Sequence, residues 1–359
     1  MILRSEHVTQ AIDEGVVATF VKDLVHVAGP EPLVMVRKRV ASGPFASNAH
    51  GTPLLLMHGF GQNRYAWHLS GRSFSNYLAS RGYDVYNLDL RGHGRSRRLG
   101  SRRTPSIDQY VREDVPAAVS EVRSLSGRSD VYIVGHSLGA LIATAAAPNF
   151  REPLGGLVLI GVPYRFASGS PVLKLFSRSV DAMASRGWLA GRRAGVPVWS
   201  VGKLLRFQRM LWDTRWVPMP IRAWSPGSFE RRLLDEWLAR SFDMASLGTL
   251  LQMVAVAMTG TFRSADGVVD YHARFEALDL PLLVLAGERD LLAPPTSVRP
   301  AYDRSRARDR TYRVFELGHG DLLLGHAAVH SVWPTVAHWL DVRAAISRKL
   351  APAEAVSLG

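Results

Sequence analysis

The sequence contains no cysteine, which excludes disulfides, thiolate metal sites and a cysteine nucleophile. It also lacks a long apolar run: the longest stretch, residues 250–258, is interrupted by Gln252 and is far too short to cross a bilayer. Residues 1–10 are mixed and polar, without the apolar segment of a signal peptide. We therefore expect no transmembrane segment and a cytoplasmic location, with peripheral contact with a membrane as the alternative.

Acidic residues are the smaller part of the charge, with 31 Asp and Glu against 44 Lys and Arg and a net charge of +13. Such an excess can attract nucleic acid or an anionic lipid surface. No nucleic-acid-binding motif accompanies it, so we expect no nucleic-acid partner. The excess is concentrated in residues 165–265, which contain 15 basic and 6 acidic residues. Another basic run, the arginines of residues 91–103, is expected to be solvated, with an anionic head group as its alternative partner.

The most informative stretch is the one around Ser137. Residues 131–134 are apolar and mostly β-branched, as in a short buried strand, and residues 141–147 are good helix formers. Between them stands Gly135-His136-Ser137-Leu138-Gly139. A strand, a tight turn and a helix are the context of a nucleophile elbow, whereas a bare Gly-Ser turn in another α/β protein is the alternative. The flanking elements favour Ser137 as a nucleophile.

Two further strands end in loops that contain the partners such a serine needs. The apolar run 280–286 leads to Asp290, and the strand-like run 311–317 leads to His319. A serine hydroxyl is a weak nucleophile until a base takes its proton, and a carboxylate keeps the imidazole in the correct tautomer. We therefore predict that Ser137, His319 and Asp290 are catalytic.

Other acids and histidines lie near these positions. Glu288 is the rival acid, and His326 and His330 are rival bases that lie closer to the final helix. Asp89 and His93 follow another strand, and we expect them to brace a hydrogen-bonded loop rather than to take part in catalysis.

An oxyanion hole is predicted from the loop that follows the apolar strand 53–57. This strand leads into His58-Gly59-Phe60-Gly61, whose small residues allow backbone N–H groups to turn toward the serine. The backbone N–H groups of Phe60 and Leu138 are the predicted donors. His58 is expected to be a structural hydrogen-bonding residue of the turn.

These motifs, together with Asp89-Leu90-Arg91-Gly92-His93-Gly94-Arg95-Ser96, resemble the α/β-hydrolase superfamily, in which the nucleophile, acid and histidine follow in this order. Residues 107–116 and 318–325 are similar to the acid lipase group. The resemblance implies a serine esterase or lipase that cleaves a lipophilic ester through an acyl-enzyme on Ser137, with no metal or cofactor. It disfavours haloalkane dehalogenases and epoxide hydrolases, which use Asp where Ser137 stands.

The expected fold is α/β, a mostly parallel doubly wound sheet with an inserted helical cap. Residues 1–161 and 278–359 form the core, and residues 16–27 and 32–40 form an opening hairpin. Between residues 162 and 277 the alternation of strands and helices lapses, and six of the nine tryptophans lie there. We expect this segment to be a mostly helical lid that supplies an acyl-binding wall and the approach to lipid.

Two other functions remain compatible with the sequence. An acyltransferase or thioesterase would use the same triad, and the acceptor that reaches the acyl-enzyme would decide between them. A non-catalytic ligand-binding protein of the same fold would be indicated by loss of a triad member, and none is lost.

Overall fold

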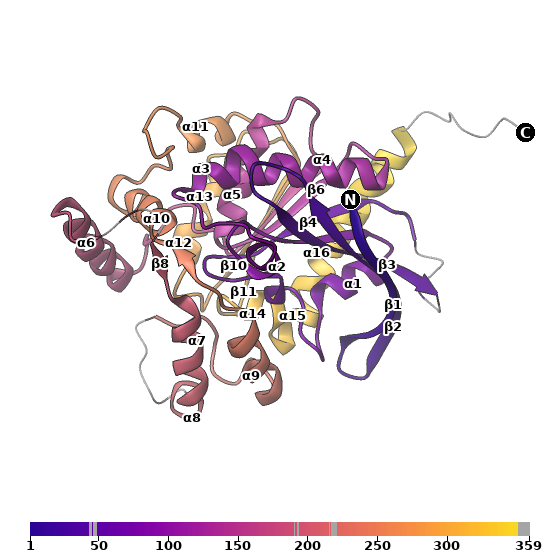
Figure 1. The fold of residues 1–359 in the computed structure, drawn as a ribbon, viewed down its shortest axis with the longest axis horizontal. Helices are drawn as coiled ribbons and strands as arrows, with labels where there is room; N and C mark the ends of the chain where they lie inside the picture. Colours follow the sequence, from indigo (N-terminus) through magenta and orange to yellow (C-terminus); the bar gives the residue numbers. More distant parts are fainter. Residues whose placement is uncertain are drawn as a thin grey trace, which may run out of the picture.

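The computed structural model describes residues 1–42, 45, 49–189, 191, 194–214, 216 and 221–350 (Figure 1). Within these residues one large sheet has the strand order β1-β2-β3-β5-β4-β6-β7-β10-β11. The strands are β1 (Ile2–Asp13), β2 (Val16–Val27), β3 (Leu33–Ser42), β4 (Pro53–Met57), β5 (Asp84–Asp89), β6 (Tyr132–His136), β7 (Gly156–Ile160), β10 (Leu282–Gly287) and β11 (Arg310–Phe315). The sheet is parallel from β5 to β11, and β1, β2 and β3 extend it as an antiparallel edge.

The predicted hairpin is confirmed as β2 and β3, and the strands around the predicted site are confirmed as β4, β6, β10 and β11. The structure adds β1, which pairs with β2 over most of its length and was not expected from the sequence.

Helices cover both faces of the sheet. They are α1 (Phe74–Ser80), α2 (Gly94–Arg98), α3 (Ile107–Gln109), α4 (Val115–Ser126), α5 (Leu138–Ala146), α12 (Pro295–Val298), α13 (Pro300–Asp303), α14 (Asp321–Leu324), α15 (His326–His330) and α16 (Val332–Leu350). Consecutive strand residues point to opposite faces, so β4 contributes to both apolar cores. Leu55 and Met57 pack in the core of α4 and α5, whereas Leu54 and Leu56 pack in the core of α1 and α16.

The segment between β7 and β10 is mostly helical. It consists of α6 (Pro171–Ser185), β8 (Gly195–Val196), α7 (Val198–Phe207), α8 (Arg209–Trp212), α9 (Arg231–Arg240), β9 (Ala245–Ser246), α10 (Leu247–Thr259) and α11 (Tyr271–Glu276). In Figure 1, α6, α7 and α8 project from one side of the molecule. The later helices pack differently, because Met253, Tyr271 and Phe275 belong to the same buried core as α5. No helix in the described part of the chain is long and apolar enough to span a membrane.

Candidate active site

Ser137 lies in a strained turn between β6 and α5. Its backbone has φ 53° and ψ −123°, a left-handed conformation that a non-glycine residue rarely adopts. The flanking glycines explain how the turn can be so tight. A Cβ on Gly135 would lie 2.5 Å from the Cα of Ala140, and a Cβ on Gly139 would collide with the carbonyl oxygen of Met57. Both positions therefore need glycine so that the helix can approach the strands.

Asp290 and His319 are joined by a short hydrogen bond. The Oδ2 atom of Asp290 lies 2.7 Å from Nδ1 of His319, and the carboxylate is almost fully buried. Its Oδ1 atom accepts backbone N–H groups from Leu292 and Ala293, both at 2.8 Å. The carboxylate is thus held in place by the loop after β10 and can orient the imidazole.

Ser137 lies beside this pair. Its backbone N–H donates to the carbonyl of Ile160 at 2.9 Å, and a Cβ on the next residue, Gly161, would be 3.3 Å from Nδ1 of His319. The ring of His136 lies 4.6 Å from that of His319, measured between centroids. Among the described residues, the Ser137 hydroxyl makes no hydrogen bond to His319. Catalytic contacts of this kind often tighten only when substrate is bound.

The loop after β4 runs next to the serine. A Cβ on Gly59 would lie only 3.0 Å from the Cβ of Ser137, so the backbone can approach closely there. The Gly59 N–H donates to Oε1 of Gln62 at 3.2 Å, which ties the loop together. Phe60 belongs to this loop, and Leu138 opens α5, where the first N–H groups have no partner inside the helix. Both predicted oxyanion donors therefore lie in segments that flank the nucleophile.

The rival residues occupy other environments. Glu288, His326 and His330 are exposed, whereas Asp290 and His319 are buried. His326 also has its Nδ1 atom 2.7 Å from the carbonyl of Ser228.

The loop histidines and Asp89, which were expected to be structural, make contacts within the loops. His58 accepts the N–H of Leu90 at 3.2 Å, and burial lowers its pKa. Asp89 pairs with Arg64 at 2.7 Å. His93 is buried, with its ring 5.2 Å from that of His58 between centroids. These three side chains hold the loops after β4 and β5 together.

Two positioning residues were missed from the sequence. His136 lies inside the Gly-x-Ser-x-Gly motif, and its Nε2 atom is 3.1 Å from the carbonyl oxygen of His319. Asp321 is buried and accepts hydrogen bonds from the N–H of Gly318 at 2.8 Å and the hydroxyl of Ser228 at 2.7 Å. Both residues adjoin predicted site residues in sequence, but only the fold shows that they support the histidine loop.

The segment between β7 and β10 contacts the loops of the site directly. A Cβ on Gly61 would collide with the side chain of Val198 at the start of α7, with a separation of 2.6 Å. The N–H of Asp243 donates to the carbonyl of Gly61 at 2.7 Å, and the N–H of Gly320 donates to the carbonyl of Ala223 at 2.6 Å. This segment therefore packs against the loops after β4 and β11, and Ser137 is only 9% exposed.

A cavity of about 530 Å³ adjoins the loops of the acid and the histidine. It is lined by Arg222, Trp224, Ser225, Pro226, Arg289 and Leu291. Leu291 directly follows Asp290, and the N–H of Ser225 donates to Asp321 at 2.8 Å. The described residues include no cluster of three or more His, Asp or Glu side chains that could hold a metal ion.

Comparison with known families agrees with this arrangement. The alpha/beta hydrolase fold family matches residues 52–325, so the chain belongs to this family. The membership and the α/β fold class predicted from the motifs are confirmed.

Curated relatives have several activities. A poly(3-hydroxyalkanoate) polymerase subunit of Haloarcula marismortui is 23% identical over 303 residues, which cover 83% of this chain and 62% of that protein. A 1-acylglycerol-3-phosphate O-acyltransferase of Pongo abelii is 29% identical over 151 residues, which cover 41% of this chain and 39% of that protein. The chain thus spans about three fifths of the length of the polymerase subunits that it matches.

Solved structures show the same fold at low sequence identity. An esterase of Thermogutta terrifontis has a TM-score of 0.55 at 18% identity and covers 89% of this chain and 98% of its own. A soluble variant of monoglyceride lipase from Saccharomyces cerevisiae has a TM-score of 0.58 at 14% identity and covers 88% of this chain and 92% of its own.

Proposed function

We propose that the protein is a serine hydrolase that cleaves carboxylic esters of lipophilic substrates. Ser137 is the nucleophile, His319 the general base and Asp290 the acid that orients it. The observation that carries the proposal is the 2.7 Å contact between His319 and Asp290 beside a serine in a strained turn. Backbone strain of this kind is concentrated at functional sites.

The reaction follows from the roles of these groups. Nε2 of His319 takes the proton of the Ser137 hydroxyl while Oγ attacks the ester carbonyl. The N–H groups of Phe60 and Leu138 stabilise the resulting oxyanion. The protonated imidazole then gives its proton to the leaving alcohol, and a water molecule activated by the same imidazole releases the acid from the acyl-enzyme. Asp290 keeps the proton on Nδ1 throughout, so that Nε2 is free to act.

A lipophilic substrate is supported by the apolar side chains exposed on and between α6, α7 and α8. We call this set the α6–α8 surface: Val172, Leu175, Phe176, Trp188, Trp199, Val201, Leu204, Phe207 and Leu211. Basic residues lie among them, with Lys203 Nζ 4.5 Å from the ring centroid of Trp199 and the Arg186 guanidinium 5.8 Å from that of Trp188. Exposed aromatic and basic side chains together suit the surface of an anionic membrane. Residues 162–277 would then act as the lid, and the protein would bind the membrane peripherally.

Acyl transfer is the second candidate, and it is favoured by the curated relatives. Two of them are named as a polymerase subunit and an acyltransferase. The same acyl-enzyme would serve, with an alcohol or thiol in place of water as the acceptor.

Labelling with a fluorophosphonate probe and a series of p-nitrophenyl esters of increasing chain length test the proposal. We expect covalent labelling of the native protein, none of the Ser137→Ala variant, and a preference for longer acyl chains. Product analysis with added alcohol separates hydrolysis from transfer. A native protein that is neither labelled nor active on any ester would favour the non-catalytic ligand-binding alternative.

A further inference from the structure

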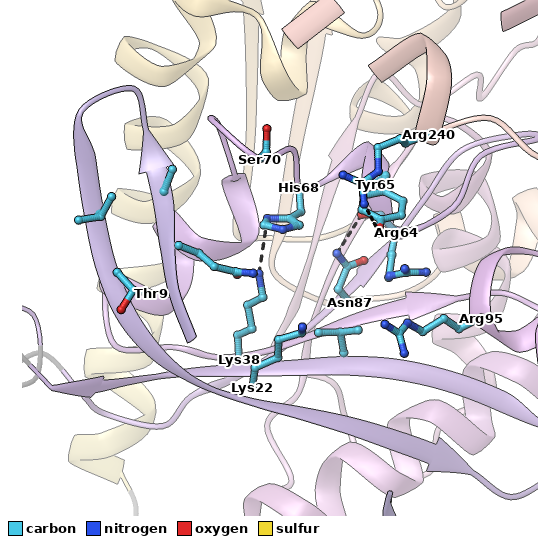
Figure 2. Close-up of a pocket in the computed structure, with 14 residues that line it drawn as sticks. Thr9, Lys22, Lys38, Arg64, Tyr65, His68, Ser70, Asn87, Arg95 and Arg240 are labelled. Carbon is cyan, nitrogen blue, oxygen red and sulfur yellow. Dashed lines mark hydrogen bonds between the residues drawn. The ribbon is translucent and has the colours of Figure 1, made fainter. Parts of the chain in front are cut away.

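A second cavity, of about 540 Å³, opens where the antiparallel edge of the sheet faces the loops after β4. Five cationic side chains line it, one each from β2, β3, the short helix η2 (Arg64–Ala66), α2 and α9: Lys22, Lys38, Arg64, Arg95 and Arg240. Its lining includes none of the three proposed catalytic residues. In Figure 2 the side chains of Lys22 and Arg95 point toward each other from opposite sides, with Asn87 beside them.

Three of the five cations have a carboxylate partner. Arg64 pairs with Asp89 at 2.7 Å, Lys22 with Glu6 at 2.8 Å, and Arg240 with Glu236 at 2.9 Å. These pairs neutralise part of the cavity wall. The other two cations, Lys38 and Arg95, have no carboxylate partner among the described residues.

Lys38 is buried, and its hydrogen-bond partners among the described residues are the neutral side chains of Asn76, Gln10 and His68. Its Nζ atom donates to Oδ1 of Asn76 at 2.5 Å and to Oε1 of Gln10 at 2.8 Å. Burial lowers its pKa well below the ordinary value, and the nearby charges of Lys22 and Arg64 act in the same direction. The ammonium form is thus disfavoured by its surroundings, and a nearby anion would reverse this effect.

Arg95 makes no ion pair with any described residue. Its Nε atom is buried and has no hydrogen-bond partner. Burial and the charge of Arg64 lower its pKa. A buried guanidinium N–H without a partner is costly, and Arg95 thus adds a positive charge to the cavity wall that no described carboxylate pairs with.

Asn87 supplies an unpartnered acceptor on the same wall. Its Nδ2 atom donates to the carbonyl of Arg64 at 3.0 Å, whereas its buried Oδ1 atom has no partner. Arg95 and Asn87 therefore both line the cavity, and each has one buried polar atom without a partner among the described residues. A ligand that satisfies both has an anionic group and a hydroxyl group.

We propose that this cavity binds a small phosphate monoester that also carries a hydroxyl group. The phosphate would lie between Arg95, Lys38 and Lys22, and the hydroxyl would donate to Oδ1 of Asn87. A phosphate monoester has up to two negative charges and three acceptor oxygens, which suits several donors that converge from different elements. Guanidinium groups bind phosphate with two parallel hydrogen bonds, which accounts for an arginine at the centre of the site.

Calorimetric and thermal-unfolding titrations of the full chain test the proposal, with glycerol 1-phosphate as the probe and chloride at equal ionic strength as the reference. We expect the phosphate ester to raise Tm beyond the chloride reference. Arg95→Gln should weaken binding at least tenfold and leave the unliganded Tm unchanged or raised, because it removes one of several crowded cations. Lys22→Gln, on the opposite wall, should also weaken binding.

Arg98→Gln is the matched control, because Arg98 lies on the same helix, is exposed, and its replacement changes the net charge equally. It should bind the probe as the native protein does. Ser137→Ala should also bind normally, which separates this site from the proposed hydrolase site. Equal effects of Arg95→Gln and Arg98→Gln, both on binding of the soluble ester and on binding of the vesicles described next, would overturn the proposal.

Vesicles that contain phosphatidic acid distinguish the two sources of a phosphate monoester. If binding of the soluble ester depends on Arg95, the ligand is a free metabolite. If only vesicle binding depends on Arg95, the phosphate is that of a lipid head group. If binding depends on Arg95 in neither assay, the proposal is wrong.

Discussion

The segment between β7 and β10 has two halves, α6 to α8 and α9 to α11, that differ in how far their large apolar side chains are exposed. In the first half, Leu175, Trp188 and Phe207 are 66%, 72% and 89% exposed. In the second half, Trp237 and Phe275 are buried. The difference shows that apolar composition alone does not identify a lid. The second half packs into the body of the protein, whereas the first half leaves large apolar side chains exposed.

The largest expected effect is the loss of ester turnover when Ser137, the proposed nucleophile, is replaced. Ser137→Ala should lower ester turnover by at least about a thousandfold, because removal of a triad nucleophile usually costs several orders of magnitude. Soluble and vesicle-bound esters should be affected alike, as measured by initial rates. The fold should persist, since the change leaves no large cavity. A variant that keeps more than about a tenth of the native rate would show that the nucleophile lies elsewhere.

The next effect compares stability between the two halves. Trp237→Ala should lower the free energy of unfolding by about 3–5 kcal/mol, because it empties a buried site. The ring packs on Phe229 and Phe242, with centroid distances of 5.7 and 4.9 Å, and a Cβ on Gly320 in the histidine loop would lie 3.0 Å from it. Phe207→Ala replaces an exposed aromatic residue of the first half and should change the free energy of unfolding by no more than about 0.5 kcal/mol. Urea unfolding measures both changes in free energy. Equal losses in the two variants would show that the two halves do not differ in what they contribute to stability.

The second half should also make the stability of the protein depend on pH, through His272. His272 stacks on Tyr164 with centroids 3.9 Å apart, and burial lowers its pKa to about 4 from an ordinary 6.5. Below pH 6.5 the unfolded chain binds a proton at this residue that the folded protein does not. Its contribution to stability is therefore full above pH 6.5 and is lost toward pH 4, by up to about 1.4 kcal/mol per pH unit.

Unfolding of the His272→Asn variant between pH 7.5 and 5 measures this contribution. The asparagine can still accept the N–H of Phe262, which His272 accepts at 3.1 Å. The variant should lose less stability on acidification than the native protein, and His330→Asn, at an exposed position, should behave like the native protein. An unchanged pH slope in His272→Asn would mean that this histidine is not the titrating group.

The smallest effect tests the α6–α8 surface. Arg206→Glu should reduce the preference for long-chain esters on anionic over neutral vesicles by at least about fivefold, because each basic residue near such a surface contributes roughly 1 kcal/mol. High salt should abolish the preference in the native protein. Arg192 and Arg193, which share this predicted role, lie outside the described residues.

Arg274→Glu in α11 makes the same charge change in the other half and should leave the vesicle preference intact. Hydrolysis of a short soluble ester should be unchanged in both variants. If both variants lose the preference equally, only net charge matters, and the α6–α8 surface has no special role.

Much of the fold follows from short sequence signals. The apolar strands and the Gly-x-Ser-x-Gly turn locate the sheet and the proposed nucleophile, because sterics allow few other residues at Gly135 and Gly139. The order of Ser137, Asp290 and His319 along the chain then places the remaining site residues. Their roles remain predictions, although the geometry of the acid and the histidine supports them.

Other features depend on tertiary contacts that no local pattern shows. Strand β1 is largely polar and exposed, and it exists because β2 offers it a hydrogen-bonding edge. The burial of α11 likewise depends on packing against α5, and that of α10 on packing against α6 and α3.

The conformation of Ser137 has a consequence for how this chain can change over generations. A left-handed residue with a side chain costs about 1–3 kcal/mol, which a glycine at the same position would not incur. Natural selection for stability alone would therefore replace the serine. A serine at φ 53° is therefore not explained by folding stability, whereas the proposed role as nucleophile would explain it. Should the activity ever become dispensable to its host, this is the position where we expect drift to begin.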